Sequence, residues 1–485
     1  MKQKSLKINY ILNLIKTTLG ILFPLISYPY VSRVLSVAGL GKINFSTSYA
    51  NYFILFAAFG VSTFAVRDGA KYRDDAKKLG KFATEMLLIN LGTSFLALVV
   101  MLFTLFLPNL SPYREIVLIF GLSIIFNTFG MEWYFQLNED YRYITLRAIL
   151  FQILSLIALF IFVKSRNDVV VYACITVLAN VGAQCLNIFK ITREIKIFGY
   201  GSYKLKEYIK PMTYIFLTLL AMNFYRYIDV TFLGFIKNDI SVGYYSLATK
   251  VTNILSSMVS SITVIITPRL AYHYGKKDFS EFFKLAYLSF DFLLLISIPL
   301  SIGVALLSPF LVDFLGGENY LPSINAVRLV SPVILISSLN ALLITPILTV
   351  MNKEKEVLRL FVIALIFNVL SNLIFINIFD FYGAAIITVI TELIICIGSL
   401  LICHKYFDIR PFFSNVTDYI LGSLGIIISY FIISRFVSNV FLLFVLVTFI
   451  GGFIYLVLLI LLKNTLMRYG LDLFRKRIGI DNGEN

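Results

Sequence analysis

Charge is scarce in this chain: only 14% of its 485 residues are Asp, Glu, Lys or Arg, whereas 59% are hydrophobic. A typical soluble domain carries about 25% charged residues. The charges avoid fourteen stretches, each close to the roughly 20 apolar residues that cross a bilayer. In hydrocarbon every backbone N–H and C=O must be satisfied internally, so stretches this long are expected to be helices. The sequence therefore predicts an all-α polytopic membrane protein with 14 transmembrane helices.

Cysteine and histidine are also rare. All four cysteines lie within predicted spans, so we expect small buried thiols and no disulfides. The two histidines, His273 and His404, lie in or beside predicted inner loops. We find no metal-ligand cluster, phosphate-binding glycine loop or nucleophile motif, and the outer loops are too short to hold a catalytic domain. The sequence therefore argues against an enzyme such as a glycan polymerase or an O-acyltransferase.

The sign of the charge follows the predicted topology. The net charge is +15, and 31 of the 42 Lys and Arg residues fall on one side of the predicted spans, against 7 on the other side and 4 within spans. Cytoplasmic loops are enriched in Lys and Arg, so this distribution places both termini in the cytoplasm. The basic surplus is explained by topology and by attraction to anionic lipid. We therefore set nucleic-acid binding aside.

The predicted spans repeat after six helices. Their approximate bounds are 10–33, 44–66, 82–107, 115–136, 146–163, 169–190, 211–236, 243–267, 284–308, 327–350, 358–378, 383–403, 417–434 and 441–462. Gly41 and Gly243 occupy equivalent places 202 residues apart, and Arg147 and Arg359 begin spans 5 and 11 alike. An even number of helices per repeat implies two bundles that point the same way, related by a pseudo-two-fold axis along the membrane normal.

This repeat divides the chain into five expected parts. Two helices stand outside the repeat, and the basic connection between the bundles is expected to be partly an amphipathic surface helix. The parts are an N-terminal six-helix bundle (1–192), a cytoplasmic linker (193–210), a C-terminal six-helix bundle (211–404), two additional transmembrane helices (405–463) and a basic cytoplasmic tail (464–485).

Three segments carry a resemblance to a known family. They are YPYVSRVLSVAGLGKINFS (28–46), GMEWYFQLNEDYRYITLR (130–147) and DVTFLGFIKNDISVGYYSLATK (229–250). Together with the pattern of six, six and two spans, they resemble the Wzx-type flippases of the multidrug/oligosaccharidyl-lipid/polysaccharide exporter superfamily. Those flippases move the lipid-linked repeat units of O-antigen, capsule and exopolysaccharide.

The resemblance implies a function. The substrate would be an oligosaccharide repeat unit on undecaprenyl pyrophosphate, a polyprenyl carrier, moved from the inner to the outer leaflet of the bacterial cytoplasmic membrane by alternating access. Partners would be this lipid-linked oligosaccharide, membrane lipids and, as further candidates, a polymerase and other polysaccharide-assembly membrane proteins. A peptidoglycan-precursor (lipid II) flippase and a multidrug exporter of the same superfamily stay open as alternatives.

Cations within the predicted spans are the candidates for substrate binding. A cation at mid-bilayer is costly, so it is expected to face a wet cavity or a partner. Arg226 lies about 15 Å below the outer end of span 7, and Lys250 about 10 Å below that of span 8. The candidates for a lumenal cationic patch that binds the pyrophosphate are Arg226, Lys250, Lys16, Arg33 and Arg328. The alternatives are an Arg226–Asp229 ion pair, snorkelling of Lys16 to the interface, and anchoring of the two span-end arginines.

Intramembrane acids are the candidates for proton or sodium coupling. They are Asp291, Asp229, Glu85 and Glu392. Asp291 comes first, because no cation lies within a helical turn of it in sequence, although each acid can equally be a paired structural carboxylate. Near the inner end of span 4, Trp133, Gln136 and Glu139 are candidates for a cytoplasmic gate, and an anchoring Trp133 is the alternative. We expect no metal and no cofactor apart from a coupling ion.

Overall fold

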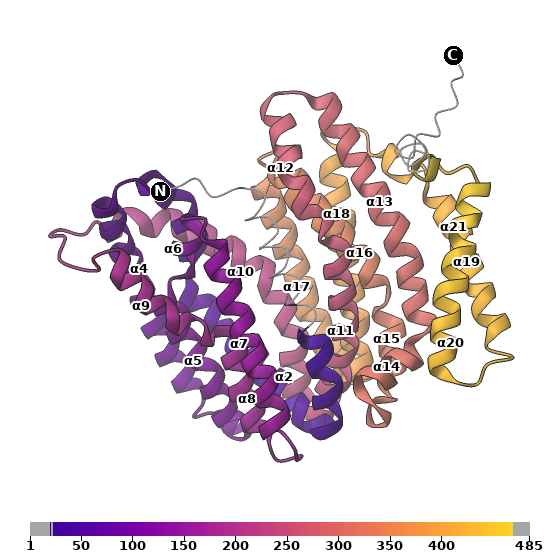
Figure 1. Cartoon of the computed structure of the whole chain (residues 1–485), viewed down its shortest axis with the longest axis horizontal. Coiled ribbons are helices and arrows are strands. Elements are labelled where there is room, and N and C mark those ends of the chain that lie inside the picture. Colours follow the sequence, from indigo (N-terminus) through magenta and orange to yellow (C-terminus); the bar gives the residue numbers. More distant parts are fainter. Residues whose placement is uncertain (1–19, 21–22, 469–485) are drawn as a thin grey trace. The chain divides into compact units, whose positions relative to one another are not determined.

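The structure is a computed structural model in which residues 20 and 23–468 are described (Figure 1). These residues form helices joined by short connections, and no strand occurs among them. This confirms the all-helical prediction. Twelve helical segments of the described residues are long and apolar enough to cross a membrane.

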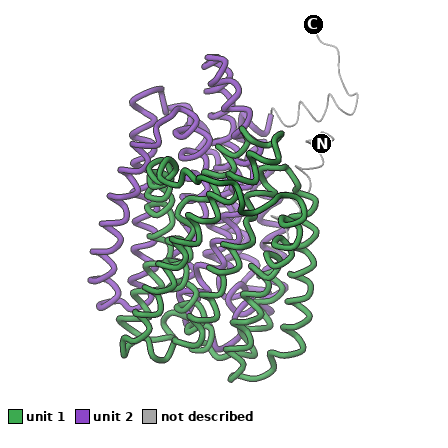
Figure 2. The backbone as a smooth tube through the Cα atoms, turned by 90° about the vertical axis from the view of Figure 1, so that its left-hand side faces the viewer, with its two compact units in different colours: residues 1–243 green, residues 244–485 purple. Residues whose placement is uncertain are grey.

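The chain divides into two compact units, Met1–Gly243 and Tyr244–Asn485, coloured separately in Figure 2. Within each unit the long helices run up and down beside one another. The helices of the first unit are α2 (Val37–Ala58), α3 (Val61–Gly69), α4 (Ala76–Thr104), α5 (Arg114–Gly130), α6 (Glu132–Leu137), α7 (Tyr141–Phe162), α8 (Val169–Val177), α9 (Gln184–Glu194) and α10 (Leu205–Ile236).

Helix α11 (Asp239–Ser260) runs from the first unit into the second. The second unit continues with α12 (Ile262–Gly275), α13 (Phe279–Leu306), α14 (Ser308–Gly316), α15 (Ser323–Val330), α16 (Pro332–Leu342), α17 (Glu354–Phe379), α18 (Phe381–His404), α19 (Val416–Ile433), α20 (Val440–Leu446) and α21 (Gly452–Leu461). The sequence-based division into bundles, linker, extra helices and tail stays a prediction.

The twelve segments correspond to twelve of the fourteen predicted spans. Predicted span 1 falls partly outside the described residues. Predicted span 7 corresponds to α10, which is a continuous helix of 32 residues, about 48 Å at 1.5 Å per residue. α10 is not among the twelve apolar segments, but it is long enough to cross a bilayer.

The connection before α10 is only partly helical. Helix α9 ends at Glu194, the residues 195–204 form no helix, and the chain becomes helical again at Leu205. The connection 190–210, expected to be partly helical, is helical at 190–194 and 205–210, where α9 ends and α10 begins, and non-helical between them. Its place on the membrane surface stays a prediction. Two glycines with positive φ, Gly199 and Gly201, explain the irregular path, because this conformation suits glycine and interrupts a helix.

Two predicted spans are broken where one or two residues adopt a left-handed conformation. Phe59 (φ 42°) and Gly60 (φ 71°) separate α2 from α3, and Met131 (φ 41°) separates α5 from α6. A Cβ at position 60 would lie 3.0 Å from the Ile215 side chain, so glycine also permits the close approach of α10. Both breaks bring short helices, α3 and α6, against the start of α4.

Helices α2 and α11 meet through the two glycines of the repeat. A Cβ on Gly41 would lie 1.7 Å from the carbonyl oxygen of Asp239, and a Cβ on Gly243 would lie 2.5 Å from the carbonyl oxygen of Val37. Each glycine thus faces the residue four positions before the other glycine. The two contacts are reciprocal, because Asp239 lies 202 residues after Val37, just as Gly243 lies 202 residues after Gly41.

Candidate functional site

Arg226 is an exposed cation on α10, in the first unit. The next residue, Tyr227, packs against Tyr52 of α2, and the centroids of the two rings are 5.9 Å apart. The hydroxyl of Tyr52 lies 3.1 Å from that of Thr231 on α10. Asp229, one helical turn beyond Arg226, is only 3% exposed. On this helix the side chain of Arg226 is therefore exposed and that of Asp229 is buried.

The other predicted cations are spread over both units. Lys250 is half-buried on α11 in the second unit, and its predicted nearness to Arg226 stays a prediction. Arg33 is exposed and donates a hydrogen bond of 2.7 Å from Nη1 to the carbonyl of Pro29. Lys16 lies outside the described residues.

Arg328 is an exposed residue of α15 that is bonded within its own unit. Its Nε donates to the hydroxyl of Ser308 at 3.1 Å, and its Nη1 donates to Oδ1 of Asn325 at 3.2 Å. These bonds tie the start of α14 to α15. Its binding of substrate stays a prediction.

Glu85 attaches the connection between α9 and α10 to α4. It is 2% exposed, and its two oxygens accept hydrogen bonds from the backbone N–H of Lys204 (2.9 Å) and the hydroxyl of Tyr208 (3.1 Å). The hydroxyl of Thr84 accepts a further hydrogen bond of 3.1 Å from the backbone N–H of Phe198. This geometry gives Glu85 a structural role, and its predicted part in ion coupling stays a prediction.

Replacing Glu85 by alanine is expected to loosen this connection. The substitution leaves a backbone N–H and a tyrosine hydroxyl without their charged acceptor, and hydrogen bonds to charged groups contribute roughly 1.5–3 kcal/mol each. Trypsin should therefore cut the purified Glu85→Ala protein faster after Lys196 and Lys204. Glu207→Ala removes only an exposed ion pair with Lys204 and should leave the cleavage rate unchanged. Equal protection of the two variants would contradict the role assigned to Glu85.

The remaining acids lie in the second unit. Asp291 on α13 is half-buried and accepts hydrogen bonds from the Tyr419 hydroxyl (2.8 Å) and the Asn415 amide (2.9 Å). Glu392 on α18 is 8% exposed, and Asn340 on α16 donates to its Oε2 at 2.7 Å. Within the described residues, no group of three or more His, Cys, Asp and Glu side chains could hold a metal ion. Coupling by these acids stays a prediction.

The predicted gate residues do not share one environment. Trp133 is 5% exposed and packs edge-on against Phe82 in a buried cluster with α3 and α4. Gln136 is half-buried, whereas Glu139 forms an ion pair of 2.8 Å with Arg73. Glu139 thereby links the end of α6 to the turn before α4. The gate itself stays a prediction.

Sequence reasoning missed a buried polar network behind Trp133. Arg147 on α7 is 4% exposed, and its Nη2 donates to Oε2 of Glu132 at 2.8 Å. Gln184 on α9 donates to the same oxygen at 2.7 Å, and Asn187 donates to Gln184 at 2.8 Å. The available signal was the pair of amides, three residues apart, in the apolar span 169–190.

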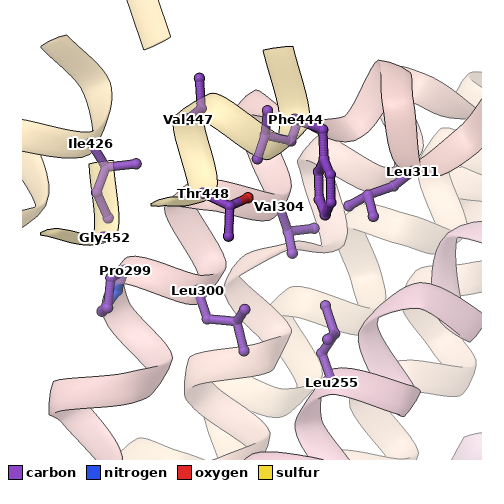
Figure 3. Close-up of a pocket in the computed structure, with 12 residues that line it drawn as sticks. Leu255, Pro299, Leu300, Val304, Leu311, Ile426, Phe444, Val447, Thr448 and Gly452 are labelled. Carbon is purple, nitrogen blue, oxygen red and sulfur yellow. The ribbon is translucent and has the colours of Figure 1, made fainter. Parts of the chain in front are cut away.

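An apolar cavity of about 260 Å³ lies in the second unit, where α13 approaches the C-terminal helices (Figure 3). Thr448 supplies the only hydroxyl in its lining. Such a cavity suits an alkyl or isoprenyl chain and offers almost no hydrogen-bond partner to a sugar. The lining residues are Leu255, Pro299, Leu300, Gly303, Val304, Leu307, Leu311, Ile426, Phe444, Val447, Thr448 and Gly452.

Comparison with known proteins finds two family models along the chain. A model described as polysaccharide biosynthesis protein matches residues 6–272, and a model described as MatE matches residues 215–378. A curated relative from Escherichia coli (strain K12), named "Putative O-antigen transporter", is 24% identical over 77% of this chain and 91% of its own length. A relative of the same name from Shigella dysenteriae is 25% identical over 78% of this chain and 95% of its own length.

Solved structures share the fold. The lipid II flippase MurJ in an inward closed conformation superposes with a TM-score of 0.75 at 17% identity, covering 94% of this chain and 99% of that one. An inward-facing multidrug resistance transporter of the MATE family gives a TM-score of 0.61 at 16% identity, covering 79% and 93%. These similarities establish a fold common to transporters of lipids and of drugs.

Proposed function

Because this chain belongs to the polysaccharide biosynthesis protein family, we propose that it flips a polyprenyl-pyrophosphate-linked oligosaccharide, of the O-antigen type, from the inner to the outer leaflet. The chain is a multi-pass membrane transporter and not an enzyme, as the family and the curated relatives indicate. The observation that carries the proposal is Arg226, an exposed guanidinium within a helix long enough to cross the membrane. Its charge suits the pyrophosphate, and a cation there is costly unless it faces water or an anion.

The proposed mechanism is alternating access between two six-helix bundles. The reciprocal contacts of Gly41 and Gly243 support the pseudo-two-fold relation, because each glycine meets the equivalent backbone position on the other helix. The length of α10 supports a thirteenth span beside the twelve apolar segments, and predicted span 1, which lies partly outside the described residues, would be the fourteenth. The excess of Lys and Arg in the predicted inner loops supports cytoplasmic termini. Proton or sodium coupling through Asp291, Asp229 or Glu392 is part of the proposal, as are contacts with a polymerase.

The decisive experiment is deletion of the gene. We expect lipid-linked repeat units to accumulate in the inner leaflet and surface polysaccharide to disappear, with both restored by the wild-type gene. Normal surface polysaccharide in the deletion strain would reject the proposal. Accumulation of peptidoglycan precursor with arrested growth would point to the lipid II flippase, and sensitivity to cationic drugs alone would point to a multidrug exporter.

An Arg226→Ala protein should restore about tenfold less surface polysaccharide than the wild type, which corresponds to about 1.4 kcal/mol of lost substrate binding. Arg226→Lys should restore an intermediate amount, because a point charge remains without the planar fork that binds phosphate oxygens in pairs. The amount of inserted protein is measured in the same membranes. Full export by a normally inserted Arg226→Ala protein would remove Arg226 from the mechanism.

A further inference from the structure

A second cavity, of about 170 Å³, lies within the first unit between α2, α3, α4, α5, α6 and α9. Its polar lining residues are Ser62, Asn90, Asn127, Thr128, Glu132, Trp133 and Gln184. Ser62 and Asn127 are exposed, so the cavity is open on their side. The cavity sits where α2 breaks at Phe59 and α5 breaks at Met131.

Several polar groups of this cavity are unused. Among the residues that the structure describes, the indole N–H of Trp133 and the side chains of Ser62 and Asn127 make no hydrogen bond. Asn90 uses its N–H to bond the Ala57 carbonyl at 3.0 Å and keeps its amide oxygen available. Trp133 is 5% exposed as a whole residue, and its indole N–H is not among the fully buried side-chain atoms that lack a partner, so this N–H keeps some exposed surface. A ligand with hydroxyl groups, or water in its absence, would satisfy these groups.

The charge of the cavity is balanced. Glu132 is the one acid in its lining, and Arg147 lies behind it with a distance of 2.8 Å between Nη2 and Oε2. Among the residues that the structure describes, this acid is matched by one cation, so the pair itself carries no net charge that would attract a cationic drug or a pyrophosphate. Gln184 donates a hydrogen bond to the same carboxylate oxygen, so the side chains of Glu132 and Gln184 are held in place before a ligand binds. The cavity therefore selects a neutral ligand rich in hydrogen-bonding groups.

We propose that this cavity binds one sugar ring of the translocated glycan and contributes to the choice of repeat unit. Its volume is near the roughly 150 Å³ cavity that holds one six-membered ring, benzene, and well below the roughly 300 Å³ at which drug-sized pockets begin. Three carboxamides, a carboxylate and an indole line the cavity. Together they supply hydrogen-bond donors, hydrogen-bond acceptors and a flat apolar face, which complement the hydroxyls and the apolar face of a pyranose. The inference rests on the proposed function, because it assigns part of the same substrate.

Trp133 makes the binding directly measurable, since it is the only tryptophan in the chain. The purified full-length protein is titrated with the methyl glycosides of glucose, galactose, N-acetylglucosamine and rhamnose, and tryptophan emission is recorded. We expect at least one glycoside to produce a saturable change at millimolar concentration. Tetraphenylphosphonium, a cationic probe, should produce none. No change with any of the four glycosides, or saturation by the cation alone, would overturn the proposal.

The matched variants are Asn127→Ala in the cavity and Asn109→Ala at the other end of the same membrane segment, where Asn109 is exposed. Asn127→Ala should weaken glycoside binding about tenfold through lost hydrogen bonds, and Asn109→Ala should bind as the wild type does. Ser62→Leu, which places a larger side chain at the opening, should abolish binding. Unchanged affinity in both cavity variants would overturn the proposal.

Export distinguishes this inference from the proposed function. If deletion of the gene leaves surface polysaccharide normal, the proposed function fails and the inference fails with it. If deletion abolishes export but Asn127→Ala and Ser62→Leu restore it fully, the flippase assignment stands and only the sugar site is rejected. Export that is restored by Asn109→Ala and reduced about tenfold by Asn127→Ala supports both.

Discussion

A Gly41→Ala protein is expected to lose at least about 3 kcal/mol of folding free energy, the upper part of the range for overpacked sites. The added Cβ would lie 1.7 Å from the carbonyl oxygen of Asp239, a distance that no real contact reaches. A flexible side chain could turn aside, but a helix backbone cannot, so α2 and α11 would have to separate. The loss should appear as a lower midpoint when the purified protein is unfolded by SDS in mixed micelles.

Gly243→Ala should be harmful to a smaller degree, since its Cβ would lie 2.5 Å from the carbonyl oxygen of Val37. Gly92→Ala is the matched control. Position 92 lies in α4, and an added Cβ there meets nothing within 4 Å. Alanine is the better helix former by roughly 0.5–1 kcal/mol, so this control should be as stable as the wild type or more so. A Gly41→Ala protein as stable as the control would mean that the two helices do not meet as described.

For these two glycines, the sequence predicted the repeat but not the contact between helices. Their 202-residue spacing revealed a repeat, because equal spacing is visible without any knowledge of contacts. The sequence could not reveal that the repeated glycines face each other's helix. Which helices touch depends on packing between segments that are far apart in sequence, and a hydropathy pattern is the same for every face of an apolar helix.

The breaks at Phe59 and Met131 were invisible for a related reason. A span is recognised from roughly 20 apolar residues taken together, and one residue with positive φ does not alter that average. The connection 190–210 was expected to be partly a surface helix because it is basic and lies between two bundles, but that pattern did not show which of its residues are non-helical. The glycines at 199 and 201 were the better indicator.

The hydrogen-bond partners of Arg147 were not predicted. The position of a residue at the end of a span indicates on which side of the membrane it lies, but not which residues it contacts. Its acceptors come from Glu132, 15 residues earlier, and from Ala183 and Gln184, more than 30 residues later. Arg359, its counterpart in the repeat, is exposed and makes no hydrogen bond with any residue that the structure describes. The same sequence pattern thus leads to a buried arginine, paired with the half-buried Glu132, in one half and to an exposed arginine in the other.

Replacing Arg147 by methionine is therefore expected to cost about 3 kcal/mol of folding free energy, the lower end of the range for breaking a buried ion pair from one side, because the Glu132 side chain is 24% exposed. Methionine keeps much of the packing volume but leaves the Glu132 carboxylate without its cation. It also removes the hydrogen bond of 3.0 Å from Nη1 to the carbonyl of Ala183. SDS unfolding of the purified protein gives the loss, and Arg359→Met serves as the matched control, with little change expected.

A second substitution separates the ion pair from the packing. In a protein that carries both Arg147→Met and Glu132→Gln, no unpaired charge remains, so the double variant should be more stable than Arg147→Met alone. Equal stability of the single and double variants would show that Arg147 acts through packing and not through charge. The same proteins bear on the cavity beside Glu132. Arg147→Met removes the cation 2.8 Å from that carboxylate, so tetraphenylphosphonium should now alter the emission of Trp133. A cation response in Arg147→Met that disappears in the double variant would trace the neutrality of the cavity to this one arginine.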